Sequence, residues 1–150
     1  MQKLTLEQAF MAMFYFLDTY YEENELEFLA CLLGVLNVQL DENMHDLAAA
    51  GLKWIGCVEK VMNEKNVQEK RKLRMNPDEA YEAMYLLAKR FSNELPNDGA
   101  QLLLSYLRTY NTESANTDIA NKWKVAVQEA ILNDYPLDVR TFDQWNGQFL

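Results

Sequence analysis

Residues that interrupt regular structure or bind metals are scarce in this chain. Its 150 residues include only 5 glycines and 3 prolines, so few positions force a helix to end. With 2 cysteines and 1 histidine, the chain lacks the roughly four nitrogen or sulfur ligands that a structural zinc site needs. These scarcities exclude both a disulfide-rich scaffold and a zinc-stabilised one.

Long apolar runs are also missing. The longest, around residues 28–36, is shorter than the roughly 18 residues required to span a bilayer. The segment Met1–Glu7 contains no apolar core followed by a small-residue cleavage site, so we expect no export signal. These features predict a cytoplasmic protein that does not act on a membrane.

The two cysteines, Cys31 and Cys57, stand where a helix would bury a small apolar residue. Their 26-residue separation matches neither a CxxC redox motif nor a zinc knuckle. A disulfide and a pair of reduced core thiols both remain possible, and a cytoplasmic location favours the thiols.

Sequence signatures of catalysis are absent as well. The chain has no phosphate-binding glycine loop and no HExxH, GxSxG or DxDxDG pattern. His45, its only histidine, lies in a turn-rich segment and is interpreted as a solvated loop residue. Carboxylates are abundant, but no pair stands out as catalytic. We predict a protein that is not an enzyme and has no catalytic residues, cofactor or metal site.

What the chain does contain is helical. Apolar residues make up 49% of it, which excludes a disordered chain, and no segment alternates with a period of two. We predict a single all-α domain over residues 1–150, a bundle of about six helices.

Two parts of the sequence align at an offset of about 70 residues. Residues 4–14 lie over residues 75–85 and share the pattern acid-x-Ala-aromatic-x-Ala-Met-aromatic. Further along, Trp54 lies over Trp123 after a two-residue slip. The order of these blocks predicts two degenerate three-helix repeats. Their expected ranges are about 4–64 and 75–132, with a basic connector at about 60–74 and a tail at 133–150 that either packs on the bundle or docks a partner.

The first helix of each repeat has the same start signal. Thr5 is an N-cap residue and Gln8 completes a capping box. In the second repeat Asn76 is the N-cap residue, Pro77 takes the first helical position and Glu79 completes the box. Both first helices therefore begin at aligned positions.

The remaining helices follow in the same order in each repeat. Middle helices are expected at about 25–37 and 98–110, and third helices at about 46–64 and 117–132. The middle helices are apolar on more than one side, so we expect them at the centre of the bundle.

Charge differs between segments. Residues 1–59 carry a net −8, residues 60–74 a net +4 and residues 75–150 a net −5. The basic segment is interpreted as a solvated helical connector or as a strip lying over an acidic repeat. A nucleic-acid partner is not expected, because the acidic repeats on either side would repel a polyanion.

An acidic cluster with tyrosines surrounds the predicted end of the first helix. Acids at a helix start are partly ordinary capping, and a plain solvated face is one interpretation. Tyrosine beside acids also offers rigid contact area and charge for a basic partner, which is the other. The candidate partner-binding residues are Tyr20, Tyr21, Glu22, Glu23, Glu25, Glu27, Asp41, Glu42 and Asp46.

The stretch Leu4–Tyr21, followed by Leu32, Leu33 and a later helix containing Trp54, resembles small bacterial immunity proteins. These are encoded beside polymorphic or contact-dependent growth inhibition toxins. The resemblance is strongest over residues 4–61 and faint over 76–131. Members of that family contain one such unit, so the doubled length leaves open which repeat or cleft meets the toxin.

What the resemblance implies is a cytoplasmic, stoichiometric toxin inhibitor. Many toxins of this kind are nucleases with basic clefts, which an acidic protein with a net charge of −9 would complement. Two alternatives stay open: an acidic secretion chaperone or adaptor, and a structural helical-repeat interaction module. Secretion chaperones of this size resemble mixed α/β dimers, and no strands are predicted here.

Overall fold

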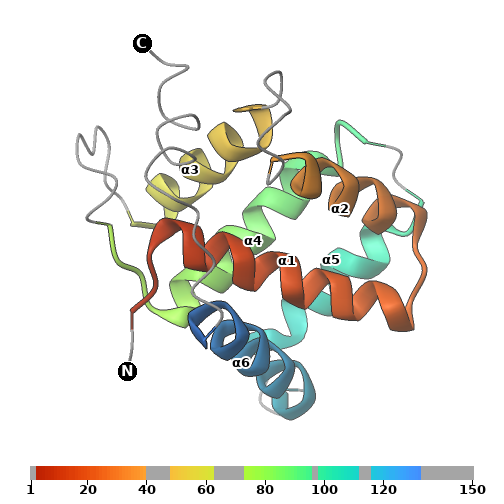
Figure 1. Cartoon of the computed structure of the whole chain (residues 1–150). Coiled ribbons are helices and arrows are strands. Elements are labelled where there is room, and N and C mark those ends of the chain that lie inside the picture. Colours follow the sequence, from red (N-terminus) through yellow and green to blue (C-terminus); the bar gives the residue numbers. More distant parts are fainter. Residues whose placement is uncertain (1–2, 40–47, 63–72, 96–97, 112–115, 133–150) are drawn as a thin grey trace.

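The computed structural model describes residues 3–39, 48–62, 73–95, 98–111 and 116–132, most of which lie in helices (Figure 1). In these ranges no strand occurs, and one isolated antiparallel bridge joins Leu4 to Met75. The predicted all-α bundle of about six helices is confirmed. The helices are α1 (Leu6–Glu23), α2 (Glu27–Gln39), α3 (Ala48–Met62), α4 (Pro77–Phe91), α5 (Ala100–Arg108) and α6 (Asn116–Leu132), with a short 3-10 turn, η2 (Thr109–Asn111), after α5.

Both predicted capping boxes are present. At the start of α1, the Gln8 N–H donates to Thr5 Oγ1 at 3.0 Å and the Thr5 N–H donates to Gln8 Oε1 at 2.9 Å. At the start of α4, the Glu79 N–H donates to Asn76 Oδ1 at 2.8 Å and the Asn76 N–H donates to Glu79 Oε1 at 2.9 Å. Each box satisfies two backbone donors that a helix start leaves unpaired.

A buried tryptophan ties the third helix of each half to the start of the first. Trp54 and Trp123 are 0% and 1% exposed. The Trp54 indole N–H donates to the Leu6 carbonyl oxygen at 3.2 Å, and the Trp123 indole N–H donates to that of Pro77 at 3.0 Å. Leu6 and Pro77 are the first residues of α1 and α4, so aligned positions make matching contacts.

Two further pairs of aligned positions also match. Phe10 meets Trp54 edge to face, with centroids 5.9 Å apart, and Tyr81 meets Trp123 in the same way at 5.4 Å. The bridge between Leu4 and Met75 pairs two aligned residues with each other through reciprocal hydrogen bonds of 2.7 and 3.0 Å. The tandem repeat itself stays a prediction, and these matching contacts are consistent with it.

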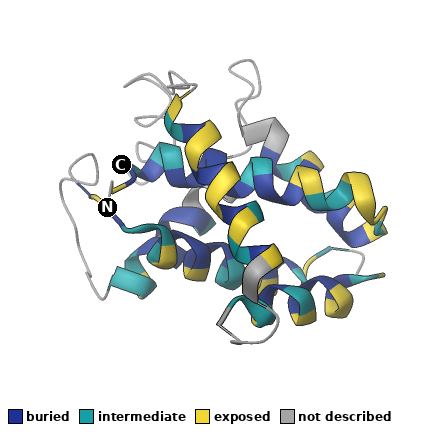
Figure 2. Cartoon of the chain, turned by 90° about the horizontal axis from the view of Figure 1, so that it is seen from below, coloured by how far each residue is buried: buried dark blue, intermediate teal, exposed yellow. Residues whose placement is uncertain are grey.

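The halves are interlocked rather than side by side. α3 packs mainly against α4, and α6 packs mainly against α1, so each third helix covers the first helix of the other half (Figure 1). Buried residues from every helix form one continuous core, with their exposed faces turned outward (Figure 2). Breaking either half would therefore expose the core of both.

The predicted central position of the middle helices is wrong. α1 and α4 lie at the centre, since each contacts four other helices. Helices α2 and α5 lie to the side, where α2 exposes Ala30 and Gly34, and α5 exposes Gln101 and Leu102. Small apolar residues make α2 apolar on several sides without requiring that each side be covered.

The cysteines are free thiols, as the preferred interpretation required. Cys57 is buried, and burial raises the pKa of its thiol, which keeps it protonated. Cys31 is only half-buried, so its expected burial is wrong. In the described part of the chain, no helix is long and apolar enough to cross a membrane. The predictions for His45, for residues 63–72 of the connector and for the tail at 133–150 lie outside the described residues.

We predict that Trp54→Phe and Trp123→Phe each lower the free energy of unfolding by about 2 kcal/mol. Each variant loses a buried hydrogen bond and leaves a gap beside the smaller ring. Urea denaturation followed by circular dichroism measures the change. Val125→Ala is the control, because Val125 is 56% exposed. A Trp54→Phe cost no larger than that of the control would contradict the structural role of the indole.

Candidate functional site

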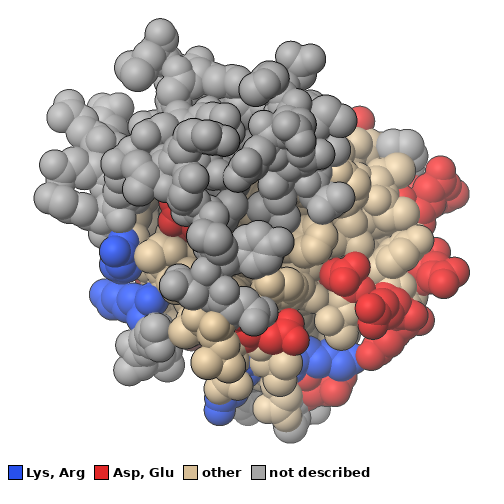
Figure 3. All heavy atoms as spheres, viewed as in Figure 1, with Lys and Arg blue, Asp and Glu red and all other residues tan. Residues whose placement is uncertain are grey.

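The predicted acidic cluster lies where α1 ends and α2 begins. Glu22 and Glu23 are the last residues of α1, Glu25 lies in the turn and Glu27 opens α2. All four side chains are exposed, and Figure 3 shows acidic side chains gathered on this side of the molecule. We call these four glutamates the acidic corner. The other predicted acids, Asp41, Glu42 and Asp46, lie outside the described residues.

Backbone hydrogen bonds fix the turn of the acidic corner. The Asn24 N–H donates to the carbonyl oxygens of Tyr20 at 2.9 Å and Tyr21 at 3.2 Å, which closes the last turn of α1. The Leu26 N–H then donates to the Asn24 carbonyl oxygen at 2.7 Å. The carboxylates on either side of this turn are therefore carried by a defined backbone.

The two residues that precede α5 support the same turn. The Phe28 N–H donates to the Asp98 carbonyl oxygen at 2.9 Å. Gly99 has a φ of +86°, and a Cβ on this residue would lie 2.9 Å from the Leu26 Cβ. Glycine is required at this position for two reasons: the backbone is left-handed, and a side chain would collide with Leu26. This contact anchors the acidic corner to the second half of the chain.

Three members of the predicted cluster are engaged within the fold. The Tyr20 ring stacks on the Tyr106 ring, with centroids 4.5 Å apart, and burial raises the pKa of Tyr20. A Glu23 carboxylate oxygen accepts a hydrogen bond from Lys122 Nζ at 3.0 Å, which raises the pKa of that lysine. Both side chains of this pair are partly exposed, so it contributes less than about 1 kcal/mol. Tyr21 is half-buried and packs against the core.

Glu22 sits where a negative charge does not stabilise its helix. The carbonyl end of α1 carries partial negative charge, and its last turn has no basic residue. Glu27 is in the opposite situation, because it lies in the first turn of α2. Helix stability therefore accounts for Glu27 but not for Glu22.

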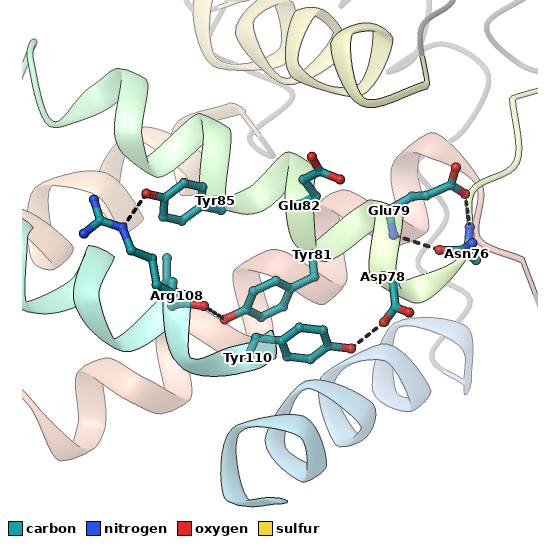
Figure 4. Close-up of a pocket in the computed structure, with 9 residues that line it drawn as sticks. Asn76, Asp78, Glu79, Tyr81, Glu82, Tyr85, Arg108 and Tyr110 are labelled. Atoms are coloured by element: carbon teal, nitrogen blue, oxygen red, sulfur yellow. Dashed lines mark hydrogen bonds between the residues drawn. The ribbon is translucent and has the colours of Figure 1, made fainter. Parts of the chain in front are cut away.

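A recess of about 500 Å³ opens between α4 and the segment formed by α5 and η2 (Figure 4). It belongs to the second half and was not predicted from the sequence. We call it the tyrosine recess. Its lining residues are Asn76, Asp78, Glu79, Tyr81, Glu82, Tyr85, Leu107, Arg108 and Tyr110.

Stacked tyrosines form part of the recess wall. The rings of Tyr81 and Tyr110 are nearly parallel, with centroids 4.0 Å apart. The Tyr81 hydroxyl donates to the Leu107 carbonyl oxygen at 2.7 Å, and the Tyr110 hydroxyl donates to Asp78 Oδ1 at 2.6 Å. Burial raises the pKa of both tyrosines, and the hydrogen bond to Asp78 raises that of Tyr110 further. Both therefore remain neutral hydrogen-bond donors at physiological pH.

The charge of the recess is negative. Asp78, Glu79 and Glu82 face one basic residue, Arg108, a net charge of −2. Arg108 Nε donates to the Tyr85 hydroxyl at 2.8 Å, and its guanidinium carbon lies 5.8 Å from the centre of the Tyr85 ring. Figure 4 shows this pair at one end of the recess and Asp78 toward the other.

A groove of opposite charge runs between α3 and α4, with a volume of about 390 Å³. It exposes Lys60, Lys89 and Arg90 around the buried Cys57. This groove is positively charged, whereas the acidic corner and the tyrosine recess are negatively charged. A basic partner is attracted to the two acidic sites and repelled by the groove.

Comparison of the chain with protein-family models, with curated proteins and with solved structures finds no match. The argument for function therefore starts from the chain's own geometry and charge. The acidic corner and the tyrosine recess are both negatively charged and are therefore complementary to positively charged groups.

We predict that Glu22→Gln raises the free energy of unfolding by a few tenths of a kcal/mol, roughly, whereas Glu27→Gln lowers it by a similar amount. The first change removes a charge that the dipole of α1 disfavours, and the second removes one that the dipole of α2 favours. Urea denaturation at low salt measures both. A loss of stability with Glu22→Gln would mean that this residue serves the fold rather than a partner.

Proposed function

We propose that this chain is an immunity protein that binds a cognate toxin domain and neutralises it by stoichiometric inhibition. The acidic corner is the observation that carries the proposal. Its glutamates are exposed, and Glu22 lies where the helix dipole opposes a negative charge. The resemblance of residues 4–61 to immunity proteins supplies the class of partner.

Charge complementarity supports a basic partner, with a nuclease domain as the preferred choice. A nuclease binds phosphates in a basic cleft, and closely spaced carboxylates can occupy such a cleft in their place. The corner offers four glutamates within six residues, on a chain with a net charge of −9. Long-range attraction would steer the two proteins together and raise the association rate above the roughly 10⁵–10⁶ M⁻¹s⁻¹ of neutral partners.

The two alternatives are weighed by different observations. Strands are absent among the described residues, which disfavours a secretion chaperone of the mixed α/β type. A structural helical-repeat module would share the fold, but its stability would not benefit from a negative charge such as that of Glu22 at the carbonyl end of a helix. The neighbouring gene separates the classes: a large secreted protein with a variable C-terminal domain favours immunity, and a secreted effector favours a chaperone.

We predict that reversing Glu22 and Glu25 to lysine slows association with the neighbouring toxin domain by about tenfold at low salt. The double variant also flattens the dependence of the association rate on ionic strength, because fewer charges take part in steering. Stopped-flow fluorescence over a range of salt concentrations measures both effects.

The matched control reverses Glu94, in the turn that follows α4, and Glu129, on α6; both are exposed, and Glu94 forms an ion pair with Lys53. Either double variant changes the net charge from −9 to −5. Any difference between the two variants therefore comes from the position of the reversed charges and not from the net charge. If both variants slowed association equally, the slowing would be due to net charge alone, and the acidic corner would be rejected as the docking site. Circular dichroism verifies that each variant is folded.

A further inference from the structure

We propose that the tyrosine recess binds an arginine side chain of the basic partner. This inference rests on the proposed function, since it names the group through which that partner is anchored. It concerns a different part of the surface from the acidic corner, because the recess lies between α4 and the segment formed by α5 and η2 (Figure 4). The corner attracts the partner, and the recess holds it.

Carboxylates that still have free acceptor capacity define one side of the recess. Glu82 is exposed and has no hydrogen-bond or ion-pair partner among the described residues. Asp78 accepts one hydrogen bond, from Tyr110, on a single oxygen. A carboxylate with an open oxygen is a strong acceptor for a guanidinium, especially in a concave site. The net charge of −2 disfavours an acidic ligand.

The chain itself already places a guanidinium at this recess. Arg108 is held by Tyr85 through both the ring and the hydroxyl, at 5.8 Å and 2.8 Å. This pair combines an aromatic contact with a hydrogen bond around a planar cation, and both kinds of interaction are available to a bound arginine. Figure 4 shows this pair at one end of the recess, Asp78 toward the other end and Glu82 between them, so that both carboxylates lie outside the Arg108–Tyr85 contact.

Arginine fits this lining better than the other cations that the charge would admit. A guanidinium is planar, stacks against tyrosine rings and donates two parallel hydrogen bonds to a carboxylate, whereas an ammonium does neither. A divalent metal is a poorer occupant, because the described residues contain no group of three metal-binding side chains. The volume of about 500 Å³ accommodates one long side chain.

The recess and the corner should differ in their kinetic effects. A carboxylate that directly contacts a bound arginine limits dissociation, while charges that attract the partner from a distance act mainly on the rate of encounter. Glu82→Gln is therefore expected to speed dissociation of the toxin domain severalfold with little change in its association rate. The acidic-corner variants have the reverse effect.

The experiment that tests the recess requires no toxin. N-acetylarginine amide is titrated into the full chain, and backbone and tyrosine resonances are followed by NMR. We expect saturable shifts at Asp78, Glu82 and Tyr110, with affinity on the order of millimolar for so small a ligand. N-acetylcitrulline amide, the neutral analogue of nearly identical shape, is expected to give no saturable shifts there.

Variants complete the test. Glu82→Gln weakens arginine binding by about threefold or more, since it removes a charged acceptor, and Glu129→Gln leaves it unchanged. Equal binding of citrulline, equal binding of N-acetyllysine amide, or shifts confined to the acidic corner would each overturn the proposal. Because no partner is present, a failed titration rejects the recess alone, whereas a failure to bind the toxin domain rejects the proposed function.

Discussion

A buried indole that donates to the first carbonyl of a helix is the interaction on which the rest of this structure depends. Trp54 makes it with Leu6 and Trp123 makes it with Pro77. The helices that carry these tryptophans also cover the first helix of the opposite half. Each indole therefore fixes its helix on the first helix of its own half, while the same helix covers the first helix of the other half. The acidic corner and the tyrosine recess are thus carried on one continuous core.

Local signals in the sequence predicted the fold well. The capping boxes of Thr5 and Asn76 require only residues three positions away, so they are readable without knowledge of the fold. The placement of the middle helices failed because apolar character shows what a helix can bury and not which neighbour covers it. The burial predicted for Cys31 on α2 was wrong for the same reason: this residue is only half-buried.

The candidate site was predictable in part. The exposed glutamates of the acidic corner are adjacent in sequence and lie together as expected, but Tyr20 is stacked on Tyr106, 86 positions away, which no local pattern could show. The recess was missed although Asp78, Tyr81, Glu82 and Tyr85 have helical spacing and so share one side of α4. Its other wall comes from α5 and η2, and that pairing depends on tertiary packing.

In this account the acidic corner and the tyrosine recess act on different steps of binding. Charge at the acidic corner governs how fast a basic partner arrives, and direct contact with the carboxylates and tyrosines that line the recess governs how long it stays. Steering needs charge that extends into solvent, and anchoring needs a concave site from which water is displaced. The positions of the two sites in the fold match these needs.

The most direct test of the central claim is the growth of cells that express the toxin domain encoded beside this chain, with and without the chain itself. The account predicts that growth is restored by the native protein, and that equal levels of the acidic-corner double variant restore it less well. A folded, abundant native protein that leaves the cells as sensitive as before would contradict the account.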